Sequence, residues 1–417
     1  MTTEVVESAG PEPPPERKAP LRSRLWHAYL YGSTPVLVLL AIVSALILGA
    51  VLIVASDEPT RTAMGYFFQH PTDVFSRGWH AIASAYIALF KGSIFNTDSL
   101  YSNGGVPVFG PISDTLTNAT PLILAGLSVG VAFRAGLFNI GAQGQLIAGA
   151  ICAGYVAFAW SLPPVIHVVA AVVAGAVGGA AWGGIAGWLK ARTGAHEVIT
   201  TIMLNYLATY LLAYLLTLNG FQRPNTNQAQ SRTTQGSARL PHLLGTHLRV
   251  HAGLFVALAA AVFCWWLLTR STLGFRLRAV GANPFAARTA GMGVERSYLV
   301  VMVLAGALAG LAGAMQILGV NTSLDPSVSG TVGFDAITVA LLGLATPQGI
   351  VLAGLLFGAL QAGSVQLLAN TTTPQDLVEV LQSVIVLFIA APGLIRLIYR
   401  LRASQGGVQQ LAKGWNG

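Results

Sequence analysis

Residues 33–55 read STPVLVLLAIVSALILGAVLIVA, an uncharged apolar run of 23 residues. A helix of about 20 apolar residues crosses a hydrocarbon core about 30 Å thick, so this run predicts a membrane-spanning helix. Composition points the same way, because 54% of the 417 residues are hydrophobic and only 9% are charged. Soluble proteins carry roughly 25% charged residues. So few charges exclude a soluble globule, a disordered chain, a coiled coil and a basic nucleic-acid-binding protein.

The same length rule finds nine further apolar segments. Three are less regular: one opens with polar residues and a proline, one carries Gly and Gln, and 334–346 is too short to span alone. We expect an all-α polytopic membrane protein with about ten transmembrane helices, some of them discontinuous. The nine further segments are 115–133, 140–160, 165–189, 198–218, 252–270, 297–319, 334–346, 349–369 and 379–398.

Two other apolar stretches have different interpretations. Residues 79–95 contain His80 and Lys91, so we expect a helix lying at the membrane surface. The run AGAVGGAAWGGIAG at 174–187 is rich in small residues, which predicts close packing against another membrane helix.

The positions of the basic residues predict the orientation. With the N-terminus in the cytoplasm and ten spans, 16 of the 23 Lys and Arg residues fall on the inner side. Cytoplasmic loops are enriched in Lys and Arg, so both termini are expected in the cytoplasm. The outer segment 219–251 nevertheless carries four Arg, which is tolerated in a long loop or serves a docking surface.

This topology divides the chain into three predicted parts. Residues 1–30, rich in Pro and Glu, form a disordered cytoplasmic tail. Residues 31–400 form the transmembrane domain, and 401–417 form a second cytoplasmic tail. Within the domain, 56–113 and 219–251 are extracytoplasmic, and 271–296 is a cytoplasmic loop.

The first interruption of the spans is FRAGLFNIGAQGQ at 133–145. Asn139, Gln143 and Gln145 lie beside Gly141 and Gly144. Amide side chains within a membrane must bond to the protein or face a water-filled cavity. The segment therefore predicts either a broken helix that lines a solute path or amides that hold helices together.

The second interruption is FDAITVALLGLATPQGI at 334–350. Asp335 stands near its start, and Pro347 with Gly349 separates it from the next span. Paired interruptions in two halves of a transporter indicate a binding site between them. Alternatively, Asp335 caps its own helix, since carboxylates favour helix N-termini.

The inner loop 271–296 contains signals for a short helix. Asn283 suits the N-cap, Pro284 the first helical position and Gly291 the position after the helix. We expect a helix at 284–290. It is either part of a solvated basic loop or a helix presented to a cytoplasmic protein.

Several motifs are missing from the sequence. It contains no GxxxxGK[ST] phosphate-binding loop, no HExxH, no GxSxG and no Cys/His metal cluster. We therefore expect no enzyme activity, no metal and no cofactor in this chain.

Four stretches, in order along 115–400, carry a family resemblance: FRAGLFNIGAQGQLIAGA, GAHEVITTIMLNYLA, LRAVGANPFAARTAGM and GFDAITVALLGLATPQGIVLAGLLFGAL. They resemble the permease subunits of bacterial ABC importers for branched-chain amino acids, simple sugars and nucleosides, with the nucleoside branch most similar. The resemblance implies an importer of nucleosides or similar solutes in the bacterial cytoplasmic membrane. It also implies three partners: cytoplasmic ATPase subunits that bind ATP-Mg, a homologous or identical second permease, and an extracytoplasmic substrate-binding protein.

The resemblance assigns the 277–292 stretch to ATPase coupling, which makes 271–296 the cytoplasmic coupling loop of a permease domain at 31–400. The residues carried over for coupling are Arg278, Gly281, Asn283, Ala287 and Gly291. For the solute path, position and chemistry select Phe138, Asn139, Gln143, Asn205, Phe334 and Asp335. Aromatic rings and amides of this kind suit a nucleoside, through stacking and hydrogen bonds.

Other functions remain open from the residues. A sugar or branched-chain amino acid permease would use the same kinds of side chain. A stand-alone secondary transporter needs no partner ATPase. A membrane-embedded enzyme is disfavoured, because the sequence contains no cluster of Asp, His or Glu at a helix end.

Overall fold

The computed structural model describes residues 34–96, 108–226, 228–243, 245, 248–371, 373–374 and 376–401. The predicted tails, residues 1–30 and nearly all of 401–417, lie outside these residues. The chain divides into a large unit, Ala41–Ala390, and a small unit of Met1–Leu40 with Ala391–Gly417. In the small unit the described residues are the start of α2 and the helix α16 (Pro392–Ile398).

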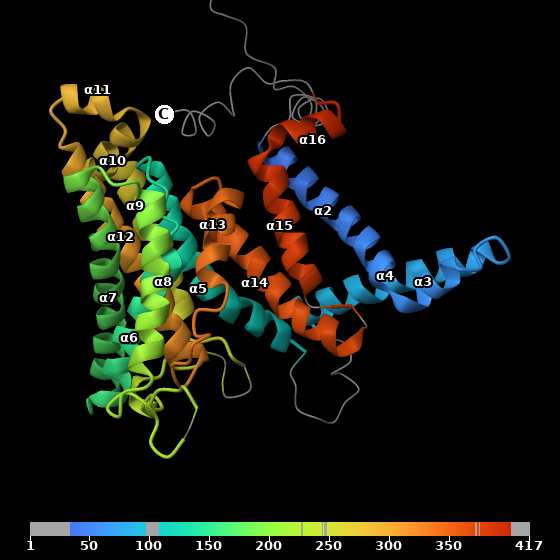
Figure 1. Cartoon of the computed structure of the whole chain (residues 1–417), viewed down its shortest axis with the longest axis horizontal. Coiled ribbons are helices and arrows are strands. Elements are labelled where there is room, and N and C mark those ends of the chain that lie inside the picture. The colour runs from blue at the N-terminus through green and yellow to red at the C-terminus, as the bar shows by residue number, and fades with distance from the viewer. Residues whose placement is uncertain are drawn as a thin grey trace, which may run out of the picture. The chain divides into compact units, whose positions relative to one another are not determined.

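Each of the ten predicted apolar segments is helical (Figure 1). Among the described residues, eight helices are long and apolar enough to cross a membrane, and α15 with α16 makes a ninth if the two form one broken span. The helix α13 has only 11 residues. The count of ten crossings and the cytoplasmic termini therefore stay predictions. The long helices are α2 (Thr34–Ser56), α5 (Gly110–Arg134), α6 (Ala142–Ala159), α7 (Pro164–Thr193), α8 (Glu197–Leu215), α9 (Gly253–Arg270), α12 (Val294–Met315) and α14 (Pro347–Asn370), with α13 (Val332–Leu342) and α15 (Asp376–Ala390) shorter.

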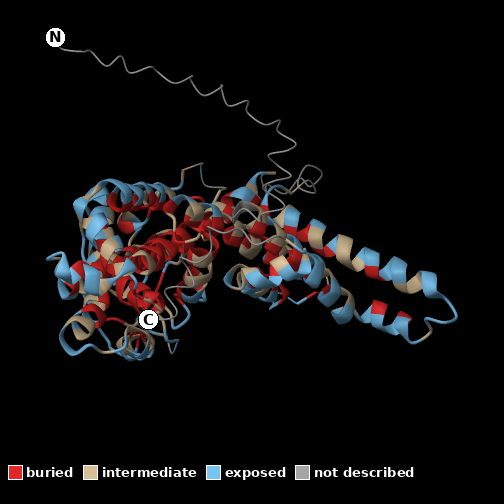
Figure 2. Ribbon diagram, turned by 90° about the horizontal axis from the view of Figure 1, so that it is seen from above, coloured by how far each residue is buried: buried red, intermediate tan, exposed pale blue. Residues whose placement is uncertain are grey.

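The core of the large unit is built around α5 and α6. Every residue of α5 from Ala119 to Ala132 is buried, and most of α6 is buried as well. Figure 2 shows continuous buried stretches of helix, in red, among helices that are exposed on one side. Helix α5 packs against α9, α12, α13 and α14, and α6 packs against α7, α8 and α12. The first interruption therefore lies between two core helices, and the second contains α13, which packs against both of them.

The predicted close packing of 174–187 is present between α7 and α12. A Cβ atom added at Gly306 would lie 2.2 Å from the Gly179 carbonyl oxygen, and one at Gly310 would lie 2.2 Å from the Gly175 oxygen. The two backbones touch, as small residues permit in membrane helices.

The segment 79–95 belongs to a longer helix, α4 (Pro71–Ser93). It packs mainly against α14, where Gly92 and Gly363 allow the backbones to approach closely. Helix α4 is not among the helices long and apolar enough to span a membrane. Its position at the membrane surface stays a prediction.

Candidate functional site

The first interruption is a turn of non-helical residues between α5 and α6. Gly136, two residues after the end of α5, has a φ of +73°, a left-handed conformation that glycine adopts without steric cost. Asn139 is fully buried, and its amide exchanges hydrogen bonds with Gln145 at 2.9 and 3.0 Å. Asn139 also donates to the Ser128 hydroxyl and accepts from the Gly141 N–H. All donors and acceptors of this amide are therefore engaged inside the protein, which holds the shape of the break.

Asn205 on α8 holds the start of α6 from the other side. Its Nδ2 donates to the Ile140 carbonyl at 2.9 Å, and its Oδ1 accepts from the Gly144 N–H at 2.8 Å. One turn earlier on α8, Thr201 packs against Gly141, where an added Cβ would lie 2.9 Å from the Thr201 Cβ. Helix α8 thus fixes the position at which α6 begins.

Gln143 connects the first interruption to α13. Its Nε2 donates to the Ser329 hydroxyl at 2.7 Å and to the Gly330 carbonyl at 2.9 Å. Its Oε1 accepts from the Gly333 N–H at 2.8 Å. Residues about 190 positions apart therefore meet at the N-termini of α6 and α13, and the two interrupted segments are joined.

A second connection joins the opposite ends of the same segments. The guanidinium of Arg134, the last residue of α5, donates to the carbonyls of Ala345 and Leu344 at 2.9 and 3.3 Å. Leu344 and Ala345 have φ values of +53° and +50°, a conformation that costs a non-glycine residue energy. Arg134 stabilises this strained turn between α13 and α14 by satisfying its carbonyl groups.

Asp335 lies in the first turn of α13, where a carboxylate suits the helix dipole, but it is not the N-cap residue. Thr331 occupies the N-cap position of α13. The Asp335 carboxylate instead accepts from the Thr331 hydroxyl at 2.7 Å and from Gln361 Nε2 on α14 at 3.0 Å. Beside it, the Phe334 side chain is 51% exposed. Phe138, in contrast, packs edge to face on Phe133, with ring centroids 5.3 Å apart.

The predicted helix of the inner loop is present as α11 (Pro284–Thr289). Asn283 Oδ1 accepts from the N–H groups of Phe285 and Ala286, both at 3.0 Å, and Gly291 has a φ of +77°. Ala287 is buried with Val280 and Val294, whereas Phe285 is 79% exposed. The helix is therefore anchored by one face and presents an aromatic side chain on the other.

The inner loop also touches the first interruption directly. It contains a helix that the sequence analysis missed, α10 (Thr272–Ala282), on which Arg278 is exposed. A Cβ added at Gly281 would lie 2.6 Å from the Arg134 carbonyl oxygen and 2.8 Å from the Gly136 nitrogen. Backbone meets backbone at this point, so α10 is in direct contact with the break between α5 and α6.

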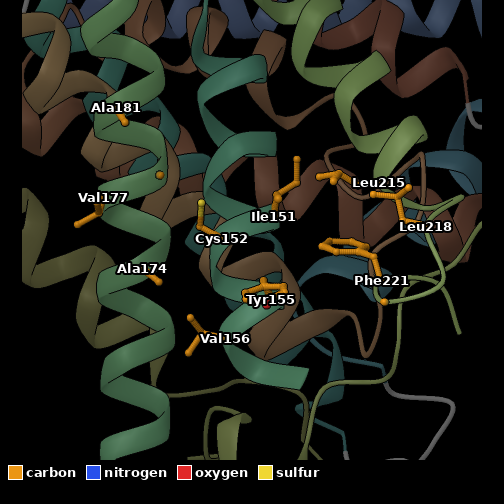
Figure 3. A pocket seen from close by; sticks show the side chains of 12 residues that line it. Ile151, Cys152, Tyr155, Val156, Ala174, Val177, Ala181, Leu215, Leu218 and Phe221 are labelled. Atoms are coloured by element: carbon orange, nitrogen blue, oxygen red, sulfur yellow. The ribbon is translucent and has the colours of Figure 1, made fainter. Parts of the chain in front are cut away.

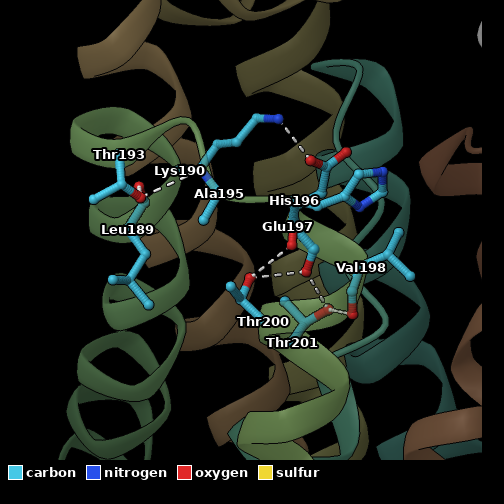
Figure 4. A network of polar contacts seen from close by, with 9 residues as sticks. All are labelled: Leu189, Lys190, Thr193, Ala195, His196, Glu197, Val198, Thr200 and Thr201. Carbon is cyan, nitrogen blue, oxygen red and sulfur yellow. Dashed lines mark hydrogen bonds and ion pairs between the residues drawn. The ribbon is translucent and has the colours of Figure 1, made fainter.

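An ion pair closes the neighbouring turn between α7 and α8 (Figure 4). Lys190 Nζ lies 2.8 Å from Glu197 Oε2. Lys190 is in the last turn of α7 and Glu197 in the first turn of α8, where each charge also suits the helix dipole. The pair fixes the N-terminus of α8, the helix that carries Asn205.

The sequence of this chain matches a family of known proteins. The family described as the permease component of the branched-chain amino acid transport system matches residues 112–390. The chain belongs to this family. It is a multi-pass membrane permease, and the matched range contains both interruptions and the inner loop.

Individual relatives cover most of the permease. It is 37% identical over 327 residues to the guanosine ABC transporter permease NupP of Bacillus subtilis, covering 76% of this chain and 88% of that protein. It is 37% identical over 295 residues to the nucleoside ABC transporter permease NupB of Lactococcus lactis, covering 69% and 81%. It is also 36% identical over 287 residues to the glucose ABC transporter permease TsgB13 of Haloferax volcanii, covering 67% and 75%.

The structure brings some predicted site residues of the permease together and not others. Gln143, Asn139 and Asn205 form one buried polar group around the start of α6. Phe334 and Asp335 follow Gly333, the Gln143 partner, but Asp335 bonds to α14 instead. The roles of all six in a solute path, and of the five coupling residues, stay predictions.

The sequence does not predict the roles of three residues in this region, Arg134, Gln361 and Ser329. The available signal for Arg134 was a basic residue at the end of a span, directly before a break. Gln361 and Ser329 carried no local signal, because each acts through a partner far away in the sequence.

Proposed function

We propose that this chain is the permease subunit of an ATP-driven ABC importer that moves nucleosides or similar small polar solutes. The observation that carries the substrate class is the similarity to permeases named for guanosine and for nucleosides, at 37% identity over 76% and 69% of the chain.

The chemistry at the start of α13 supports this substrate class. Phe334 offers a half-exposed aromatic ring, on which a nucleobase can stack. The neighbouring Asp335 carboxylate and Gln361 amide supply acceptors and a donor for ribose hydroxyl groups. A glucose permease remains the second candidate because of the 36% identical relative, but a hexose has no base to stack on Phe334.

The inner loop supports a partner ATPase. The sequence contains no phosphate-binding loop of the GxxxxGK[ST] type, so ATP-Mg would be bound and hydrolysed by a separate subunit. Helix α11, anchored through Ala287, presents Phe285 to such a subunit. A second permease chain and an extracytoplasmic substrate-binding protein complete the proposed complex in a bacterial cytoplasmic membrane.

The test is uptake by the complex reconstituted in liposomes with its ATPase and binding protein. We expect ATP-dependent uptake of radiolabelled guanosine and inosine, and none of glucose or leucine. Uptake without any ATPase subunit would identify a secondary transporter, and uptake of glucose alone would identify a sugar permease. Replacing residues 283–291 by a Gly/Ser linker should abolish uptake while the complex still binds its solute.

A pair of variants tests the α13 site within the same assay. Phe334→Leu should raise the KM for guanosine while leaving ATPase activity intact, and Phe334→Tyr should behave like the wild type because it keeps the ring. An equal KM for all three proteins would show that Phe334 does not contact the solute.

A further inference from the structure

A cavity of about 800 Å³ lies between α6, α7 and the end of α8 (Figure 3). This volume is in the range of small-molecule sites, roughly 300–1,000 Å³. Its lining is almost wholly hydrocarbon, and includes Ile151 and Val156 of α6, Ala174 and Val177 of α7, and Leu215 and Phe221 at the end of α8 and beyond. A lining with so few hydrogen-bonding groups cannot orient a polar solute, so this cavity is not part of the proposed path.

The cavity opens onto an apolar face of the protein. Two of its lining residues, Tyr155 and Val177, are 49% and 61% exposed. On either side of the opening, α7 exposes Val173 and α8 exposes Tyr210 and Tyr214. In a membrane such a face meets lipid chains, so a lipid can enter the cavity sideways.

Leu218, Gly220 and Phe221 line one end of the cavity, and two arginines lie near this end. Arg232 donates its backbone N–H to the Phe221 carbonyl at 3.0 Å, and its guanidinium donates to the Asn219 carbonyl at 3.4 Å. The guanidinium of Arg223 donates to the Thr233 hydroxyl at 2.6 Å. Residues 219–251 contain four Arg and no Asp or Glu. Each guanidinium has five N–H donors, so both retain donors for an anionic oxygen.

We propose that this cavity binds one acyl chain of an anionic phospholipid, whose phosphate lies on Arg223 and Arg232. The occupant must combine a long apolar part with a negative charge at one end, because the lining is apolar and the rim is cationic. A phospholipid has this chemistry, and it reaches the cavity from the bilayer in which the helices stand. In the predicted orientation the lipid belongs to the outer leaflet. The proposal does not depend on which solute the permease carries.

The first experiment measures lipid retention by the full-length chain in detergent, using native mass spectrometry with phosphatidylglycerol and phosphatidylcholine added in equal amounts. We expect the wild type to retain phosphatidylglycerol preferentially. The double variant Arg223→Gln/Arg232→Gln should lower that preference about tenfold, because each basic residue near an anionic lipid adds to the electrostatic attraction between protein and headgroup. The matched control is Arg249→Gln in the same segment, where the guanidinium already pairs with Asp114 at 3.4 Å. It should keep the wild-type preference.

A second variant separates the acyl chain from the headgroup. Ala181→Phe, at an exposed position of the lining, should lower retention of both lipids, whereas the arginine variant loses only the preference. Equal retention by wild type and both variants would overturn the proposal. So would a fall in stimulation by the binding protein with lipid preference unchanged, which would make the arginines a docking surface. Altered self-association of Ala181→Phe with unchanged lipid retention would also overturn it, because the cavity would then be an interface between two copies.

Discussion

At the scale of single residues, Gly281 makes the tightest connection between the inner loop and the core. Its Cα faces the backbone of Arg134 and Gly136, and a Cβ would lie 2.6–2.8 Å from backbone atoms that cannot rotate away. Glycine is required here for a close approach, not for its φ angle.

We therefore predict that Gly281→Ala will lower uptake at least about tenfold, because a misplaced contact of this kind alters the geometry of a distant site. Uptake and ATPase activity of the reconstituted complex are the measurements. Gly293→Ala is the matched control in the same loop, since its added Cβ would lie 3.7 Å from its nearest neighbour. Equal losses of uptake in both variants would show that the loop tolerates no added side chain at either position, and that the contact of Gly281 is not specific.

His251, before α9, is a buried imidazole outside the spans. It is 1% exposed, its Nδ1 accepts from the Gly253 N–H at 3.1 Å, and its Nε2 has no hydrogen-bond partner in the described part of the chain. Burial, with a smaller contribution from His242, lowers the pKa of His251 from 6.5 to about 4. The neutral ring is thus the form that the folded protein accepts.

The pH dependence follows from this direction. Between about pH 6.5 and pH 4 the unfolded chain binds a proton at His251 and the folded chain does not, so the free energy of unfolding falls as the pH falls. The full loss, reached below about pH 4, is on the order of 3 kcal/mol. Thermal unfolding of the purified protein at pH 7.5 and pH 4.5 measures this loss of stability. His251→Phe should lose less stability between the two pH values than the wild type. An identical change in the variant would assign the effect to other groups.

At the scale of elements, α11 could be predicted from sequence because its signals are local. Asn283 bonds to N–H groups two and three residues away, and Gly291 adopts the left-handed conformation that its type favours. The neighbouring α10 is not predicted from the sequence, although its cap is also local, because the Ser271 hydroxyl accepts from the Gly274 N–H at 2.9 Å. Only Ser271 separates α10 from α9, so no turn residues indicate that a new helix begins.

We predict that Asn283→Ala will destabilise α11 by about 1 kcal/mol and reduce coupling to the ATPase. The measurement is solute-stimulated ATPase activity of the reconstituted complex. Asn283→Ser, which retains a capping oxygen, should restore most of that activity. Failure of the serine variant to differ from the alanine variant would mean that the amide contacts the partner instead of capping the helix.

At the scale of the whole molecule, the sequence could locate the two interruptions but not the contacts that join them. Local composition alone identified both segments: amides and glycines within an apolar run for 133–145, and Asp335 with Pro347 and Gly349 for 334–350. The bonds from Arg134 to Leu344 and from Gln143 to Gly333 join residues about 200 positions apart. Such contacts depend on how the helices pack, and one chain read alone contains no signal for them.

These contacts form one connected path. Helix α10 touches the break after α5 through Gly281, and the side chain of Arg134 at that break bonds to the strained turn before α14. A displacement of the inner loop should therefore reach both interruptions together. If so, Gly281 and Arg134 act on the same movement, and their substitutions will not be independent.

A double-mutant cycle tests this path. Arg134→Gln removes charged hydrogen bonds that contribute about 1.5–3 kcal/mol, so on its own it should lower uptake about tenfold or more. Combined with Gly281→Ala, it should cause a loss close to that of the more damaging single variant. Combined with Arg249→Gln, whose partner Asp114 lies elsewhere on α5, the losses should multiply. Multiplying losses for Gly281 and Arg134 as well would mean that the inner loop reaches the second interruption by another route.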